Sequence, residues 1–167
     1  IKAWACFSAT QVSQTYSRTG TLITVTMTAH GMITGQFVSL DFTTGTATDG
    51  WYQITVTGVD TFTVVDAASG ATSGNVTRLL WLKSGLNIAS MVRNAVGNYT
   101  VTFTTPMVDE FYAANLSVRL NIISNGTPDY SGPGTKTAST LVIFTGVRDA
   151  GTSSGADYQE LNLTVVR

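Results

Sequence analysis

The sequence has few of the residues that most often carry out chemistry. Among its 167 residues there is one cysteine, Cys6, and one histidine, His30, and only 11% of the residues are charged. An ordinary soluble domain carries about 25% charged residues. A single cysteine cannot form an internal disulfide, and one Cys with one His makes no cluster at metal-binding spacing. We therefore expect neither a metal site nor another cofactor.

Charge of one sign and long apolar runs are also missing. Nine basic residues offset ten acidic ones, and the basic residues form no cluster. Because nucleic-acid binding depends on clustered Lys and Arg that displace counterions, we expect no nucleic-acid partner. No run approaches the roughly 20 apolar residues that cross a bilayer, so we expect no membrane insertion. The first residue is Ile and no signal-type segment precedes it, which suggests a piece of a longer protein.

Small hydroxylated and flexible residues are abundant instead. The chain has 29 Thr, 14 Ser and 16 Gly, more than a third of its length, while 43% of its residues are hydrophobic. That apolar content exceeds what disordered polar tracts contain. We expect a folded chain whose surface is covered by hydroxyls and amides rather than by ions.

Apolar residues alternate with polar ones along most of the chain. Ile23, Val25 and Met27, for example, alternate with threonines, as a strand with one buried face requires. The alternation predicts strands over residues 21–28, 38–42, 52–57, 61–64, 99–104, 112–122, 141–147 and 161–165. Clusters of Gly, Asn, Asp and Ser predict turns at residues 43–50, 66–75, 94–98, 125–134 and 149–157. No segment shows helical periodicity.

Short strands with turn signals between them predict an all-β fold. We expect an antiparallel β-sandwich with an inserted small β-sandwich or barrel module. The composition changes at Thr10 and again near Arg78. The predicted domains are a terminal sandwich of residues 1–9 plus 81–167 and an inserted Thr-rich module of residues 10–80.

Several stretches carry a resemblance to a known family. They are Lys-Ala-Trp at 2–4, residues 86–94, residues 97–107 with Gly-Asn-Tyr-Thr-Val-Thr-Phe-Thr-Thr at 97–105, and Phe-Tyr-Ala at 111–113. Together with a closing strand at 157–167, they resemble the C-terminal domain of tailed-bacteriophage tail fibres over residues 1–9 and 84–167. Stretches between residues 29 and 76 resemble a β module of phage tail and virion proteins. Its insertion departs from the family pattern.

The resemblance implies a virion surface protein, part of a tail fibre exposed to the extracellular medium. Such fibres are homotrimers whose C-terminal end helps to contact the host. The implied partners are a host cell-surface glycan or envelope receptor and other virion tail proteins. The alternative is a structural virion protein: a capsid decoration, a head fibre or a tail adaptor module.

Catalysis has little support among the residues. His30 stands before a Gly turn with no Gly-x-Ser-x-Gly elbow elsewhere, so we interpret it as a strand-end His that bonds a backbone carbonyl. Cys6 is interpreted as a small buried apolar residue. The close acidic pairs, Asp109 with Glu110 and Asp157 with Glu160, are typical of solvated surface charge. We predict that the chain is not an enzyme; a polysaccharide-degrading enzyme is the weaker alternative.

Aromatic residues beside loops are the candidate ligand-binding residues. By alternation, Trp51 faces away from Tyr52 and Ile54, where it could stack on a sugar ring while Asp49 accepts from hydroxyls. The alternative is that Trp51 covers a neighbouring strand or subunit. Tyr130 beside Asp129, and Tyr158 beside Asp157, are expected to be exposed loop aromatics that could contact a glycan.

Overall fold

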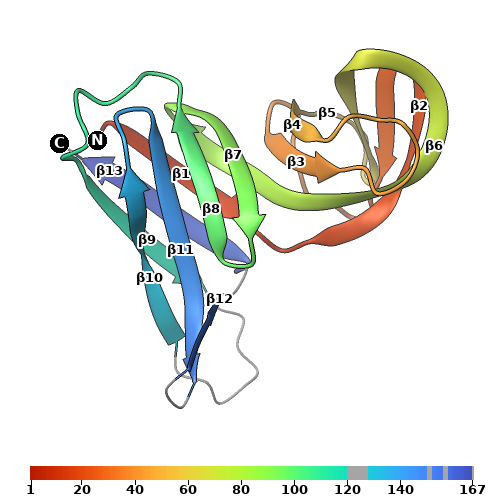
Figure 1. Ribbon diagram of the computed structural model, residues 1–167. Coiled ribbons are helices and arrows are strands. Elements are labelled where there is room, and N and C mark those ends of the chain that lie inside the picture. Colours follow the sequence, from red (N-terminus) through yellow and green to blue (C-terminus); the bar gives the residue numbers. More distant parts are fainter. Residues whose placement is uncertain (120–127, 150–151, 156–157, 167) are drawn as a thin grey trace. The chain divides into compact units, whose positions relative to one another are not determined.

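A computed structural model of the chain describes residues 1–119, 128–149, 152–155 and 158–166. All regular secondary structure in these residues is β-strand (Figure 1). The strands form antiparallel sheets that are not closed into a barrel. The predicted fold class, an all-β antiparallel sandwich, is confirmed. None of the described residues forms a helix capable of crossing a membrane.

The chain divides into two compact units. Unit 1 consists of Ile1–Thr10 and Ser84–Arg167, and unit 2 consists of Gln11–Lys83. The domain boundaries predicted from the sequence differ from these by one to three residues. Unit 2 is thus inserted between the first strand of unit 1 and the remainder of that unit.

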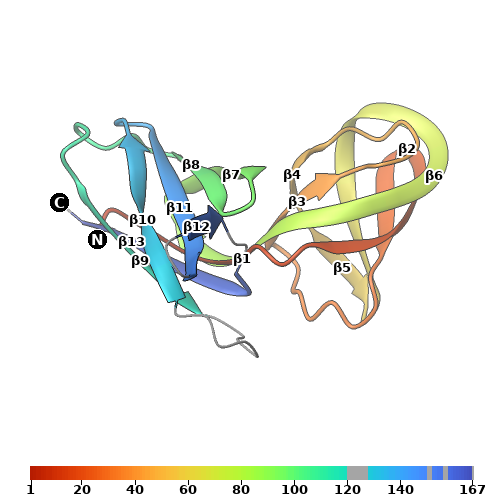
Figure 2. The same ribbon diagram turned by 60° about the horizontal axis from the view of Figure 1, so that its bottom comes forward.

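Unit 1 is built from two sheets (Figures 1 and 2). One contains, in spatial order, β1 (Ala3–Ser8), β13 (Glu160–Val166) and β9 (Ala113–Arg119). The other contains β10 (Pro128–Lys136), β11 (Thr140–Asp149), β8 (Asn98–Phe103) and β7 (Ile88–Ala95), with β12 (Thr152–Gly155) paired to β11. Because β1 pairs with β13, with Ala3 opposite Val165, the first and last strands lie side by side.

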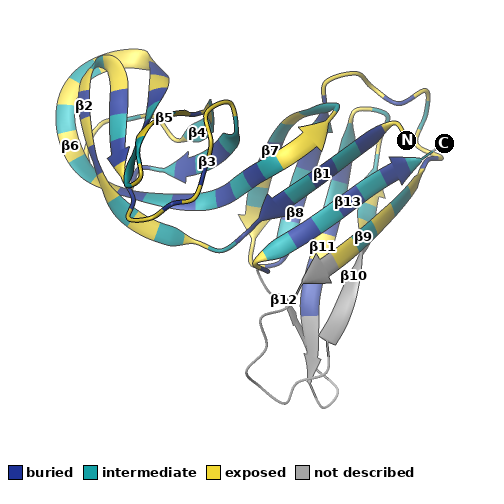
Figure 3. Cartoon of the chain, turned by 180° about the vertical axis from the view of Figure 1, so that it is seen from behind, coloured by how far each residue is buried: buried dark blue, intermediate teal, exposed yellow. Residues whose placement is uncertain are grey.

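The alternating sequence places apolar residues between these sheets. Buried and half-buried residues alternate along β1 and β13 (Figure 3). The Phe7 ring on β1 meets the Tyr99 ring on β8 edge-on, with 5.9 Å between centroids, so these two residues join the sheets. Cys6 points to the other face of β1 and is half-buried. The prediction that Cys6 is a buried residue is therefore wrong.

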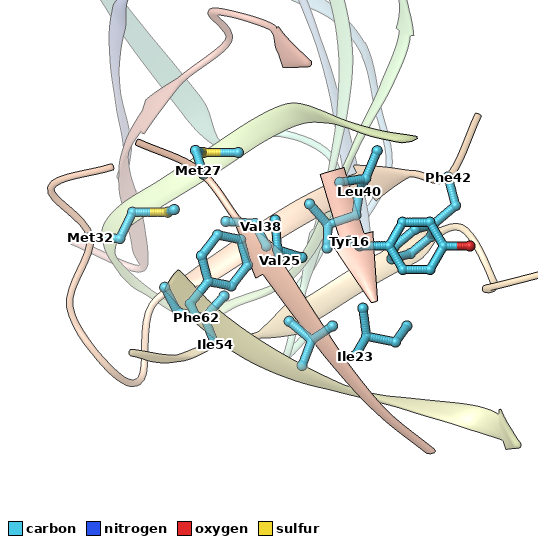
Figure 4. Close-up of a cluster of buried hydrophobic side chains, with 12 residues drawn as sticks. Tyr16, Ile23, Val25, Met27, Met32, Val38, Leu40, Phe42, Ile54 and Phe62 are labelled. Atoms are coloured by element: carbon cyan, nitrogen blue, oxygen red, sulfur yellow. The ribbon is translucent and has the colours of Figure 1, made fainter. Parts of the chain in front are cut away.

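Unit 2 is organised around one long strand, β6 (Thr61–Leu86), whose last residues belong to unit 1. Its partners are β2 (Val12–Thr26), β3 (Phe37–Asp41), which also pairs with β4 (Gly50–Gln53), and β5 (Thr55–Gly58). Twelve buried side chains form its core (Figure 4). The Tyr16 and Phe42 rings pack edge-on at one end, 4.8 Å apart, and Met27 and Met32 lie at the other.

Some predicted turns are strands in the structure. β6 continues through residues 66–75, and β2 begins at Val12, well before the predicted start at residue 21. Gly20 lies opposite Gly70, and the next pair is Leu22 with Val65, so the extra residues of β6 are absorbed as an irregularity in the ladder. Gly, Ala and Ser let the paired strands bend there without separating.

Two further predicted turn segments show the same difference, whereas residues 43–49 form a loop and residues 96–97 a turn, as predicted. Residues 128–134 belong to β10, and residues 152–155 form β12. Cross-strand bonds to β11 hold both segments, which residue composition alone does not reveal. Residues 120–122, the end of the predicted strand at 112–122, lie outside the described residues.

Candidate binding site

His30 is used structurally. Its Nδ1 accepts from the Met32 backbone N–H at 3.0 Å, and its Nε2 lies 3.2 Å from the Gly58 carbonyl oxygen. With Nδ1 as acceptor, Nε2 carries the proton and donates to that carbonyl. The ring also packs edge-on against Phe62, 5.5 Å away. The predicted bond of His30 to a backbone carbonyl is confirmed, but its predicted place at a strand end is wrong, because β2 ends at Thr26 and His30 lies in the loop that follows.

The loop of residues 43–49 in unit 2 is held by side chains from the strands beneath it. Tyr16 Oη donates to the Thr44 carbonyl at 2.9 Å, and Arg18 Nη1 donates to the Thr46 carbonyl at 2.9 Å. From the other side, Thr44 Oγ1 accepts from the Asn75 N–H at 2.7 Å. Backbone groups of the loop are therefore already engaged by the strands of its own unit.

A buried ion pair lies under this loop. Arg18 Nη2 is 3.3 Å from Asp66 Oδ2, and both side chains are 1% exposed. Asp66 also accepts from the Thr48 N–H at 3.0 Å and the Ala68 N–H at 3.1 Å. Burial favours a higher pKa for the Asp66 carboxyl, but these hydrogen bonds and the Arg18 charge outweigh it and lower the pKa below 3.8.

Tyr52 completes this polar cluster. Its hydroxyl donates to the Thr48 carbonyl. Burial, followed by the negative charges of Asp66 and Asp49, raises the pKa of Tyr52 to about 12. A neutral phenol at every physiological pH suits a group that serves as a hydrogen-bond donor.

The structure separates the roles predicted for Asp49 and Trp51. Asp49 is exposed, and its Oδ1 accepts from the Phe42 N–H at 2.6 Å, which closes the loop. Trp51 on β4 is half-buried and stacks on Phe37 of the adjacent strand β3, with 5.8 Å between centroids and 9° between planes. The structure thus contains the alternative contact, Trp51 covering a neighbouring strand. Binding of a sugar at Asp49 and Trp51 stays a prediction.

The other predicted binding residues are not brought together by anything in the described structure. Asp129 and Tyr130 belong to strand β10, and their side chains lie outside the described part. Asp157 also lies outside the described residues. Tyr158 is only 4% exposed, and its hydroxyl donates to the Gly146 carbonyl at 2.7 Å. The expectation that Tyr158 is an exposed loop aromatic is wrong, because its ring is part of the core of unit 1.

Unit 1 has a pocket that the sequence did not indicate. Its volume is about 600 Å³, within the range of small-ligand sites. Three segments form it: the residue before β1, the joint between β6 and β7, and the chain that follows β8. The lining residues are Lys2, Leu86, Asn87, Thr104, Thr105, Pro106, Met107 and Val108.

Asn87 holds these three segments together. Its Nδ2 donates to the Lys2 carbonyl at 3.2 Å and to the Thr105 carbonyl at 2.9 Å, while its Oδ1 accepts from the Thr105 N–H at 2.6 Å. Its backbone has a φ of 60°, in the left-handed region that asparagine tolerates better than most residues. The pocket is therefore a preformed feature of unit 1.

Apolar side chains surround the pocket. Leu86 is 52% exposed and Val108 is 84% exposed, whereas Met107 is buried at 7%. Near them in sequence, Ile1 is 76% exposed and Phe111 is 80% exposed. Val108, Phe111 and Ile1 are the most exposed large apolar residues in the described part of the chain. Leu86 and Val108 therefore offer exposed apolar surface to a ligand or partner at the pocket.

Sequence reasoning missed this pocket for an identifiable reason. In the sequence, residues 86–87 and 104–107 stand out only as parts of the stretches that resemble the tail-fibre domain. One local signal was available: the alternation of β8 stops at Thr104, and Thr-Thr-Pro-Met-Val follows without it. The pocket itself depends on Asn87, whose side chain bonds Lys2, 85 positions earlier, and Thr105, 18 positions later. No local sequence pattern contains such contacts.

Comparison of the chain with protein-family models, with curated proteins and with solved structures finds no match. Within the described residues, no group of three or more His, Cys, Asp and Glu side chains is placed to hold a metal ion.

Proposed function

We propose that the chain is a non-enzymatic binding fragment of a tailed-bacteriophage tail fibre that attaches the virion to a glycan or other receptor of the host envelope. In this proposal it forms a homotrimer, contacts other tail proteins and is exposed at the virion surface. Three copies would strengthen weak individual contacts through avidity.

One observation carries the proposal. The stretches that resemble the tail-fibre domain lie at residues 1–9 and 84–167, far apart in sequence, and they fall in one compact unit of residues 1–10 and 84–167. The stretch Gly97–Thr105 contains all of β8, a strand in the middle of one sheet of that unit. Stretches that belong to one domain are expected to fold together in this way.

Binding of the purified chain to whole bacteria and to an array of lipopolysaccharides and capsular polysaccharides tests the proposal. We expect at least one envelope preparation to bind, and the mass in solution to be three times that of the chain. Failure to bind any preparation in the panel would contradict the attachment function. A monomeric mass would contradict the trimer.

The role of Trp51 can be tested in the same assay. Truncation of an aromatic anchor typically costs about 2 kcal/mol, or roughly 30-fold in affinity. We expect Trp51→Ala to weaken glycan binding by at least tenfold, and the matched control Phe111→Ala, an exposed aromatic of unit 1, to leave it unchanged. Equal affinity of Trp51→Ala and the unaltered chain would remove Trp51 from the binding site.

A structural virion protein is the second candidate. The exposed apolar residues Val108 and Phe111 favour it, because such residues are typical of contacts between proteins. Localisation of the chain in a virion map distinguishes the candidates. An attachment protein occupies a distal fibre tip, whereas a decoration or adaptor protein contacts capsid or tail neighbours.

A further inference from the structure

The pocket of unit 1 combines an apolar wall with a single charge. Leu86, Met107, Val108 and Pro106 supply the apolar side chains. Among the described residues that line it, Lys2 alone is charged, and its side chain is exposed at the pocket. A cation beside an apolar surface suits a ligand with an apolar body and an anionic end.

We propose that this pocket binds a small amphipathic carboxylate, an aliphatic chain that ends in a carboxylate group, for which octanoate serves as the probe. The aliphatic chain packs on Leu86, Met107 and Val108, and the carboxylate pairs with the Lys2 ammonium group. This site goes beyond the proposed attachment function and does not depend on it.

The backbone around the pocket favours a small ligand over an added peptide strand. A bound peptide strand would need free N–H groups along the pocket edge. The Thr104 N–H donates to the Asn87 carbonyl at 3.3 Å, the Thr105 N–H to Asn87 Oδ1 at 2.6 Å, and the Met107 N–H to the Ala138 carbonyl at 2.7 Å. Since these donors are engaged, side-chain contacts and the Lys2 charge remain for recognition.

The aliphatic chain and the carboxylate of the ligand are each expected to contribute a separate factor to its affinity. Each buried methylene contributes about fourfold in affinity, so the Kd should fall about fourfold per carbon from butanoate to octanoate. An exposed ion pair contributes roughly two- to fivefold. Octanoate should therefore bind more tightly than 1-octanol, and acetate should not bind measurably.

Methionine methyl groups provide the readout in the full chain. Of the four methionines, Met107 lines the pocket, Met91 lies in the core of unit 1, and Met27 and Met32 lie in the core of unit 2. In a chain labelled with ¹³C-methyl methionine, titration with octanoate should shift the Met107 signal and leave the other three in place. The titration also gives the Kd.

Matched variants separate the two contacts. Lys2→Gln should weaken octanoate binding about threefold and leave 1-octanol binding unchanged, while the control Lys83→Gln should change neither. Leu86→Gln should weaken both ligands about tenfold. Its control is Val92→Gln, because Val92 is also 52% exposed but does not line the pocket.

Three results would overturn the proposal. The first is an unshifted Met107 signal at 10 mM octanoate, roughly the upper limit for a specific weak site. The second is an equal octanoate Kd in Lys2→Gln and the unaltered chain. The third is a Met107 signal that shifts with protein concentration alone, which would assign the pocket to a second copy of the chain. None of these results bears on envelope binding, so failure of this proposal and failure of the attachment function are distinguishable.

Discussion

At the scale of the residue, the loop over unit 2 depends on close contacts that leave no room for an additional methyl group. Gly45 has a φ of 90°, and a Cβ atom there would lie 2.1 Å from Tyr16 Oη, the group that donates to the Thr44 carbonyl. Gly35 has a similar φ of 94° but no atom within 4 Å of such a Cβ. Substitutions at these two glycines therefore distinguish the cost of backbone strain, which both share, from the cost of a steric clash, which only Gly45 has.

We therefore expect Gly45→Ala to destabilise unit 2 more than Gly35→Ala does. Both substitutions place a side chain at positive φ, which costs about 1–3 kcal/mol, but only the first displaces Tyr16 and breaks its bond to the loop. The additional loss should be about 1–2 kcal/mol. Urea unfolding of the two variants measures the difference. Equal unfolding free energies would show that Tyr16 does not hold the loop.

Asp66 makes the unfolding free energy of unit 2 depend on pH in the acidic range. The pKa of its carboxyl is lowered in the folded chain from the ordinary value of 3.8. Its contribution is therefore complete above pH 3.8 and is lost as the pH falls through the lowered folded value. We expect the unfolding free energy to decrease with acidification below about pH 4, as measured by urea titrations at several pH values.

The variant Asp66→Asn tests this assignment. It leaves Arg18 buried without its partner charge, which typically costs about 3–5 kcal/mol at neutral pH, and it should lose less additional stability on acidification. The control Glu110→Gln changes an exposed residue of unit 1 and should keep the acid dependence of the unaltered chain. An unchanged acid dependence in Asp66→Asn would assign the effect to other carboxyl groups.

At the scale of the element, the joint between β6 and β7 is one residue, Asn87, with a left-handed backbone and three side-chain hydrogen bonds. Asn87→Gly removes the bonds but permits the backbone. Asn87→Ala removes the bonds and adds strain of about 1–2 kcal/mol.

We expect Asn87→Ala to be the less stable of the two variants by about 1 kcal/mol, with both below the unaltered chain. Thermal unfolding followed by the near-ultraviolet signal gives the comparison, and ¹³C-methyl spectra of Met107 and Met91 report whether the pocket or the core has changed. A variant Asn87→Gly as stable as the unaltered chain would show that the joint does not depend on its side chain.

β6 shows how far an element can be predicted from local sequence. The alternation around Phe62 and Val64 predicted its start correctly. Gly70 and Gly74, however, led to the prediction of a turn where the strand continues. In the structure Gly74 is needed because a Cβ there would lie 2.5 Å from Thr44 Oγ1 and 2.6 Å from the Thr44 carbonyl oxygen. Gly74 permits the close approach of the loop that contains Thr44, and the same residue type predicts a turn when that segment is unknown.

At the scale of the whole molecule, unit 2 begins and ends on paired strands. Val12 lies opposite Arg78 at the start of the β2 and β6 ladder, so the inserted segment begins and ends on adjacent strands. A domain with adjacent ends and its own core is expected to fold when it is excised.

We expect residues 11–83 produced alone to fold. The measurement is a ¹H–¹⁵N spectrum, in which dispersed amide signals and a Met27 and Met32 methyl pattern matching the full chain indicate the native core. The complementary chain, residues 1–10 joined by a short Gly-Ser linker to 84–167, should retain the Met91 and Met107 signals. A collapsed spectrum for the 11–83 segment would show that its core needs the rest of the chain.

Composition and alternation determined the fold class, the absence of helical periodicity and the approximate limits of the inserted segment. These properties are local, because a period of two and the preferences of Thr, Val and Gly act within a few residues along the chain. The bond of His30 to a backbone carbonyl was also predicted, but its placement at a strand end was wrong, because β2 ends at Thr26.

Only the tertiary structure decided which polar groups are engaged and which surfaces are open. It buried Tyr158, turned Trp51 onto Phe37 and placed Arg18 against Asp66 beneath a loop. It also brought Lys2, Asn87 and Met107 to one pocket. These outcomes depend on contacts between residues far apart in the chain, and the free energy of such contacts is set by packing and hydrogen-bond geometry that no local sequence pattern contains.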